Sequence, residues 1–495
     1  MSGIAGRSAG ASPSTESPAD VSLGLLMARG PGPRPAKVLS SQGLLDPPAL
    51  TEASMHRLPP AGGYLDAPGG DPGDLTLQRW GLVVPEDPAR REELLSWCAP
   101  LRALRELQQR APARVYSVPP GMDGPQSVQW LRDVFRPSAR ERELPRYLLI
   151  LGDLHEVSLE LQQVLAGDRF VGRLAFDRER DWRAYVEKVL SWEVRLRPLL
   201  PKALFFCAHD GSEATRWGYP RLIQHAVSEC LEQLAHRELP ASVVQELSTP
   251  SQWSRDVLLA QVCEQHPSVL LSLSHGLGPP ADRSWSPAEQ RAHQGALCLG
   301  NELLGADVLS SRPFLPGGLW LPVACFGAGT PATSLFRHWL VRALEEVGSY
   351  VPPERVVPVI GDMPERPFVS GPVKAALANG DGPLAVLGHV DLAWTNSFQD
   401  ERGRSEARAF TSAMRSFIAG ERFGIGANVL ARSAISLALD ILRHQDADER
   451  ERAGGQRAPA WRLRRGLLWM TYCDLSAYIL VGDPAARLSV PARRD

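Results

Sequence analysis

Short apolar runs alternate with amphipathic stretches along most of this chain. The apolar runs are continuous, and continuous runs predict strands that are buried on both faces of a sheet. Their alternation with helical patterns predicts βαβ units on a parallel sheet. The predicted strands are 81–85, 114–118, 147–152, 203–208, 268–274, 318–326 and 384–389, with a β-rich stretch at 242–247.

The amphipathic stretches predict helices between these strands, so that the expected fold class is a three-layer α/β/α protein with a mostly parallel sheet. A proline-rich stretch at 196–202 divides an α/β subdomain, 79–198, from a second domain, 199–490. Pro322 falls inside a predicted strand and predicts a bulge or an early end of pairing. The predicted helices are 87–109, 126–136, 178–194, 219–236, 252–265, 287–304, 331–347, 405–418 and 427–445.

Two segments lack such a pattern. Residues 1–78 are rich in Pro, Gly, Ser and Ala, and we expect a mostly disordered arm there. Residues 446–459 are polar enough to predict a mobile loop. The start of the chain does not look like a secretory signal, and no uncharged apolar run approaches the ~18 residues of a membrane span, so we expect none.

Composition excludes several classes of protein. The formal net charge is −2, from 54 basic and 56 acidic residues, which argues against a nucleic-acid partner. The seven cysteines are scattered and form no CxxC pair, unlike a disulfide framework or a zinc site. We therefore expect a reduced, cytoplasmic protein that uses no metal or other cofactor.

Two predicted strands end in reactive side chains. One ends in His275-Gly276, and the other ends in Ala324-Cys325 and is followed by glycines. The histidine and the cysteine are 50 residues apart, which leaves room for a crossover helix between neighbouring parallel strands. Because ligands bind beyond the carboxyl ends of such strands, we expect imidazole and thiol to meet at one rim of the sheet.

This pair suits acyl transfer through a thioester. His275 would act as general acid and base, and Cys325 would act as nucleophile. Gly276 leaves room for a substrate backbone, and its N–H can join that of Cys325 in an oxyanion hole. The other cysteines are expected to behave as small buried apolar residues.

The strand ending in His-Gly and the strand ending in Ala-Cys resemble those of the caspase clan of cysteine peptidases. The caspase signature QACxG is absent. Instead, "YLLILGDLHEV", "DRFVGRLAFD" and the terminal "AYILVGDPAARL" resemble gingipain-type members of this clan. The resemblance covers about residues 78–490 and implies a bacterial, caspase-like endopeptidase with a protein or peptide substrate. That substrate would be a specific protein, such as a pore-forming effector, or the chain itself, cut in the arm or in 276–317.

In gingipain-like enzymes, two loops build the pocket for the substrate side chain at P1, just before the cleaved bond. The matching loops are 209–220 and 388–398. Asp210 and Glu213 would select a basic P1 residue, whereas Arg216 would select an acidic one. Asp391 and Trp394 are candidates for charge and packing in the same pocket. This balance favours Arg or Lys at P1, and no third residue that orients the imidazole can be assigned.

Two other classes of function stay open. The chain could be a catalytically silent scaffold with a caspase fold, which binds partners through its arm or through 446–459. A remote alternative is a metallophosphoesterase, because "GDLHE" at 152–156 carries the Asp-x-His pattern of such enzymes.

Overall fold

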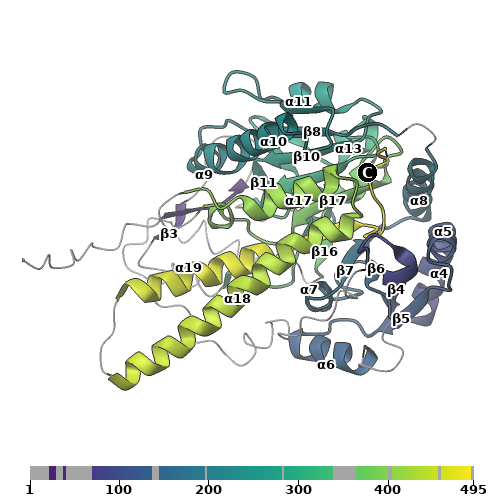
Figure 1. Ribbon diagram of the computed structural model, residues 1–495, viewed down its shortest axis with the longest axis horizontal. Helices are drawn as coiled ribbons and strands as arrows, with labels where there is room; N and C mark the ends of the chain where they lie inside the picture. Colours follow the sequence, from purple (N-terminus) through teal and green to yellow (C-terminus); the bar gives the residue numbers. More distant parts are fainter. Residues whose placement is uncertain are drawn as a thin grey trace, which may run out of the picture.

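The computed structural model describes residues 22–28, 37–40, 70–135, 144–195, 198–280, 282, 284–337, 364, 366–399, 404–454 and 459–491. A ten-stranded sheet runs through the middle of the molecule (Figure 1). In spatial order its strands are β5 (Arg114–Val118), β4 (Trp80–Pro85), β6 (Tyr147–Leu151), β7 (Phe170–Leu174), β18 (Tyr478–Gly482), β17 (Ala385–His389), β14 (Leu319–Val323), β10 (Ser268–Leu273), β8 (Lys202–Cys207) and β9 (Val243–Glu246).

Neighbouring strands of this sheet are parallel everywhere except between β17 and β18. The strands from β5 to β18 therefore run opposite to those from β17 to β9. Because β18 comes from the end of the chain and lies between β7 and β17, the stretches 79–198 and 199–490 share one sheet. The predicted mostly parallel sheet is confirmed.

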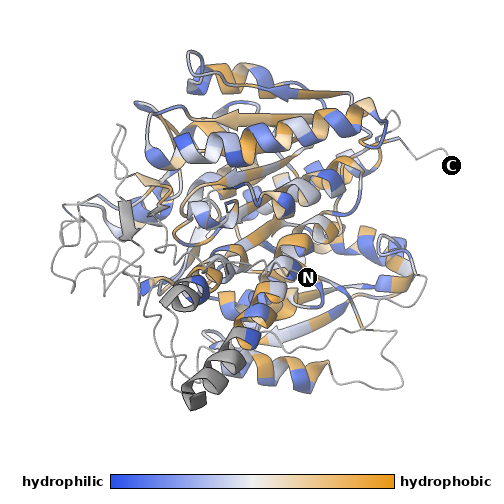
Figure 2. Cartoon of the chain, turned by 60° about the vertical axis from the view of Figure 1, so that its left-hand side comes forward, coloured by the Kyte–Doolittle hydropathy of each residue, from blue (hydrophilic) through white to orange (hydrophobic). Residues whose placement is uncertain are grey.

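Strand β6 shows why the sheet is covered on both faces. Leu148 and Ile150 belong to a cluster with side chains of α6 (Gly124–Val134) and α7 (Leu159–Ala166). Their neighbours Leu149 and Leu151 belong to the main core, together with α4 (Pro88–Trp97) and α5 (Ala99–Gln109). Alternate residues of a strand point to opposite faces. Apolar colour is accordingly concentrated in the strands of Figure 2, which confirms the three-layer prediction.

Further helices complete the two outer layers. They are α8 (Glu179–Glu193), α9 (Glu213–Gly218), α10 (His225–Ala235), α11 (Arg255–Val262), α12 (Pro287–His293), α13 (Ala306–Ser311), α16 (Gly371–Ala378) and α17 (Arg408–Ile418). Between α9 and α10 the helix continues as a π-helical turn, Tyr219–Gln224.

Helices α18 (Phe423–Gly454) and α19 (Pro459–Ser476) form a long hairpin whose far end extends beyond the sheet (Figure 1). Residues 446–454, predicted as a mobile loop, continue α18 as helix. Within it, Phe423–Arg443 is long and apolar enough to cross a membrane, judged by length and composition alone. Core helices of globular proteins meet the same criterion, and this helix contacts β7 and β18.

The sequence prediction was wrong over 297–304. Helix α12 ends at His293, and the rest of the expected helix forms strands β12 (Leu297–Leu299) and β13 (Glu302–Leu304). Gly300 turns the chain between them with φ of +68°, a conformation that favours glycine. In the described part of the helix predicted at 331–347, residues 331–336 are bends and a turn and Arg337 is helical, whereas residues 338–347 lie outside the described residues.

Pro322 lies inside β14 and has the consequence that was predicted. Strand β14 pairs with β10 along its whole length, with Pro322 opposite Ser272. Its pairing with β17 covers only Leu319 and Trp320. The ladder on that side thus ends early, next to the residue that lacks an N–H.

The glycine motifs quoted above hold the two halves of the sheet together. A Cβ on Gly172 would lie 2.2 Å from the carbonyl oxygen of Gly482, so a side chain cannot fit at that point. The neighbouring Arg173 is buried and donates a hydrogen bond of 2.8 Å to the carbonyl oxygen of Gly152. These residues therefore have structural roles in the closely packed strands around β18.

Candidate active site

The structure brings His275 and Cys325 to the same rim of the sheet. Strands β10 and β14 are parallel neighbours, with Leu273 opposite Val323, and each candidate residue follows two positions later. Gly276 packs directly on the backbone of Cys325, because a Cβ at this glycine would lie 1.8 Å from the carbonyl oxygen of Cys325. The side-by-side arrangement expected from the sequence is therefore present.

One ring nitrogen of His275 is held and the other is left open. Nε2 is hydrogen-bonded to Oγ of Ser212 at 2.8 Å and lies 3.3 Å from Oδ2 of Asp210. Nδ1 is buried without a hydrogen-bond partner. A proton on Nε2 satisfies the carboxylate and leaves Nδ1 as the nitrogen that can accept a proton.

Asp210 is itself held in place by the start of α9. Its Oδ1 atom accepts hydrogen bonds from the backbone N of Ser212 at 3.0 Å and from Oγ1 of Thr215 at 2.6 Å. Ser212 is the N-cap of α9, because its side chain accepts from the backbone N of Thr215. Asp210, expected in the P1 pocket, has its carboxylate next to the imidazole instead.

The burial of His275 determines its charge. Only 2% of the residue is exposed, and burial lowers the pKa of His275 below its usual value, although the Asp210 carboxylate partly opposes this effect. The imidazole is therefore neutral at neutral pH. Neutral imidazole is the form that can remove a proton from a thiol.

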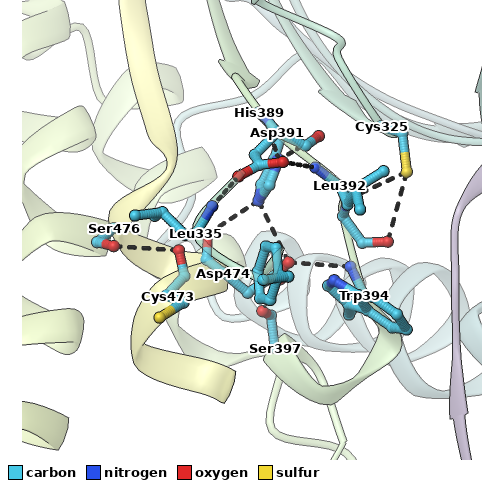
Figure 3. A network of polar contacts seen from close by, with 12 residues as sticks. Cys325, Leu335, His389, Asp391, Leu392, Trp394, Ser397, Cys473, Asp474 and Ser476 are labelled. Atoms are coloured by element: carbon cyan, nitrogen blue, oxygen red, sulfur yellow. Dashed lines mark hydrogen bonds and ion pairs between the residues drawn. The ribbon is translucent and has the colours of Figure 1, made fainter. Parts of the chain in front are cut away.

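Cys325 is fully buried next to the backbone of Ala393. The N–H of Ala393 donates to the Cys325 sulfur at 3.1 Å (Figure 3). Burial nevertheless raises the pKa of the Cys325 thiol well above its usual value, so that the resting side chain is protonated. The next residue, Phe326, has φ of +57°, a strained conformation for an aromatic residue, of a kind that clusters at functional sites.

The other proposed pocket residues lie as follows. Asp391 is buried, and its two carboxylate oxygens accept from the backbone N of Leu335 and of Leu392, each at 2.7 Å. Burial raises the pKa of Asp391 to about 6. Glu213 is half-buried and Arg216 is exposed, both on α9. None of these contacts places a carboxylate in a pocket next to the Cys325 thiol.

Trp394 and its neighbours are fixed by a buried acid that the sequence analysis did not select. Asp474 on α19 accepts from the backbone N of Trp394 at 2.9 Å and from Oγ of Ser397, and it lies 3.2 Å from Nε2 of His389 (Figure 3). Although burial alone would lower the pKa of His389, the carboxylates of Asp474 and Asp391 raise it overall. The only sequence signal was a lone acid within the apolar stretch that ends α19.

Part of the predicted disordered arm lies in the site. The backbone N of Leu26 donates to the carbonyl oxygen of Ala393 at 2.9 Å, and Leu25 forms an antiparallel bridge with Trp394. Just after it, β2 (Met27–Ala28) pairs in parallel with β11 (His275–Leu277). Residues 22–28 and 37–40 are thus placed in the structure, and most of the rest of the arm lies outside the described residues.

Two backbone amides converge on the carbonyl oxygen of Leu26. The N–H of Gly276 donates to it at 3.0 Å, and the N–H of Cys325 donates to it at 3.1 Å. These are the two donors that the sequence analysis selected for an oxyanion hole. Donor distances of about 2.7–3.1 Å are those expected of such a hole.

The structural roles of the "GDLHE" motif differ from those of a metal site. Asp153 pairs with Lys374 at 2.7 Å and accepts from the backbone N of Val369 at 2.6 Å. Over the described parts of the chain, no group of three His, Cys, Asp or Glu side chains is arranged to hold a metal ion. The contacts of Asp153 thus give the metallophosphoesterase alternative no support.

No family model matches this chain, and no curated protein matches it by sequence. Solved structures similar to it include the following two. One, described as a protease, covers 83% of this chain and 79% of its own, with a TM-score of 0.46 and 10% identity. The other is the Arg-specific cysteine proteinase gingipain R, which covers 84% and 79%, with a TM-score of 0.44 and 10% identity. Likenesses at this level assign neither activity nor site residues.

Proposed function

We propose that this protein is a cysteine endopeptidase with a His275–Cys325 dyad. The observation that carries the proposal is the convergence of the Gly276 and Cys325 amides on one carbonyl oxygen next to a buried thiol. The open Nδ1 atom of His275 supplies a base at the same rim. A thiol, a neutral imidazole and a preorganised oxyanion hole are the parts that acyl transfer requires.

The reaction would have two stages. The Cys325 sulfur attacks the carbonyl carbon of the peptide bond as its proton passes to His275. The tetrahedral oxyanion accepts hydrogen bonds from the Gly276 and Cys325 amides. The C–N bond then breaks, the proton moves to the leaving amine, and a thioester remains. Water, deprotonated by His275, attacks the thioester and releases a carboxylate and the free thiol.

Asp210 would be the third residue of the site and would act through His275. Its carboxylate favours the tautomer with the proton on Nε2 and stabilises the imidazolium that forms when Nδ1 accepts the thiol proton. Because Asp210 and Asp391 are already hydrogen-bonded elsewhere, their contacts do not support the Arg or Lys preference at P1 that the sequence favoured.

The catalytically silent scaffold remains the rival class. It would keep the fold without needing an unbonded imidazole nitrogen and a pair of converging amides at one rim of the sheet, so the site geometry favours the enzyme. A protein substrate follows from endopeptidase activity. A pore-forming effector as that substrate, and a cytoplasmic location, stay predictions.

A peptidyl electrophile that carries a fluorophore tests the proposal. It should label the wild-type chain and fail to label Cys325→Ala. Cys263→Ser removes an exposed thiol and should leave labelling unchanged. Because the arm covers the site, labelling is also measured in Leu26→Asp, where a charge replaces a buried apolar side chain. Two results would favour the scaffold: equal labelling of the wild type and Cys325→Ala, or no labelling in either the wild type or Leu26→Asp.

A further inference from the structure

Residues 24–28 cross the candidate active site as an extended segment. Upstream of the Leu26–Met27 bond, Leu25 is bridged to Trp394, and the N–H of Leu26 donates to Ala393. Downstream of it, Met27 and Ala28 pair with β11. Main-chain pairing on both sides is how an extended peptide docks by strand addition.

The carbonyl between these two docked halves occupies the oxyanion hole. The Leu26 oxygen is 3.0 Å from the Gly276 nitrogen and 3.1 Å from that of Cys325, the residue that carries the thiol. Other backbone hydrogen bonds of residues 24–28 have different partners, among them Thr395, Ala393 and Gly278. The geometry therefore selects one bond in this segment.

We propose that the bond between Leu26 and Met27 is a self-cleavage site of this chain, and that the site takes leucine at P1. This inference rests on the proposed function and adds its first substrate. In the first stage, a bond forms between the Cys325 sulfur and the Leu26 carbonyl carbon, and the Leu26–Met27 bond breaks. The thiol proton passes through His275 to the new amine of Met27. Water then releases Leu26 as a carboxylate and restores the thiol.

The burial of Leu26 argues for an apolar P1 side chain. Leu26 is completely buried and belongs to the main apolar core, with Leu25 and Met27 beside it in the segment. A basic side chain buried there would need an acid partner. Of the acids proposed for the P1 pocket, Asp210 is held by His275 and Asp391 by backbone amides.

The arm is tied down on the upstream side of the bond. Strand β1 (Ser22–Gly24) pairs with β3 (Lys37–Ser40), which lies downstream of it in the chain. The N–H of Gly24 also donates to Oγ1 of Thr395 at 3.2 Å. Residues 1–26 can therefore stay bound after the bond is cut, so cleavage has to be measured under denaturing conditions.

The chain contains a matched control within the same arm. Gly43-Leu44-Leu45 repeats the tripeptide Gly24-Leu25-Leu26. Four versions of the chain are purified, incubated and analysed by intact mass and N-terminal sequencing: the wild type, Cys325→Ala, Leu26→Asp and Leu45→Asp. The inference predicts a product that begins at Met27 in wild type and Leu45→Asp, its absence in Cys325→Ala, and at least tenfold slower formation in Leu26→Asp.

A synthetic peptide shows whether the Leu26→Asp variant still has a working active site. The peptide SLGLLMAR, which copies residues 22–29, is added to Leu26→Asp and should be cut between leucine and methionine. The same peptide with arginine in place of the third leucine, which copies Leu26, should be cut at least tenfold more slowly. Faster cutting of the arginine peptide would overturn the P1 assignment.

The outcomes separate this inference from the proposed function. Cleavage of added peptides without a Met27 product in the wild type, or a product that begins after Arg29 or Arg34, would overturn the inference and leave the peptidase standing. If neither the wild type nor any variant cut peptides or reacted with the peptidyl electrophile, both the self-cleavage inference and the proposed peptidase function would be overturned.

Discussion

The Nε2 atom of His275 lies 3.3 Å from Oδ2 of Asp210. Asp210→Asn keeps the shape but removes the charge that stabilises an imidazolium. We expect kcat for peptide cleavage to fall by about 10²–10⁴-fold with little change in KM. Asp256→Asn, at an exposed carboxylate, should have no effect. If Asp210→Asn instead mainly raised KM for arginine peptides, Asp210 would belong to the P1 pocket.

The pH profile should reflect the burial of the dyad. Because the pKa of His275 is lowered, the imidazole stays neutral, and kcat/KM should hold at neutral pH and fall only below about 6.5. The folded chain then binds fewer protons than the unfolded chain, so acid should also reduce the free energy of unfolding. Activity that already falls above pH 7 on the acid side would contradict this prediction.

Gly276→Ala should damage both the fold and the oxyanion hole. The added methyl would lie 1.8 Å from the carbonyl oxygen of Cys325, so the backbone must shift. We expect a loss of about 1–3 kcal/mol in the free energy of unfolding, measured in urea, together with loss of electrophile labelling. Gly380→Ala is the matched control, because its Cβ would meet nothing within 4 Å. Equal stability of the two variants would refute the close packing at Gly276.

Asp474→Asn should loosen the segment that faces the arm. The change leaves the buried His389 without its ion-pair partner, and loss of one partner of a buried pair costs about 3–5 kcal/mol. Urea unfolding measures this loss, and peptide cleavage should also slow because Trp394 loses its backbone anchor. Asp440→Asn, on the exposed side of α18, should change stability by less than about 0.5 kcal/mol. A similar small change for Asp474→Asn would show that the pair contributes little.

The sequence predicted those features that follow from local pattern. Continuous apolar runs located the central strands, and their ends located His275 and Cys325. It did not predict β7, because Gly172 and Arg173 interrupt the apolar run. Nor could it identify Asp474, whose partners His389 and Trp394 are about 80 residues away.

The arm was missed for a different physical reason. Five residues, 24–28, have no measurable period, and their extended conformation depends on main-chain hydrogen bonds to β11 and to Ala393. Asp210 was assigned to a pocket because nothing in the sequence specifies which of two nearby groups a loop carboxylate will face. Contacts between distant segments decide both cases.

Since the arm and the site belong to one covalent chain, their encounter is governed by an effective concentration. Effective concentrations of tethered groups reach the order of millimolar. An outside peptide that binds more weakly than this would be kept out until the arm leaves. The newly made protein would thus be its own competitive inhibitor, and its activity on other substrates would begin after a lag whose length does not depend on protein concentration.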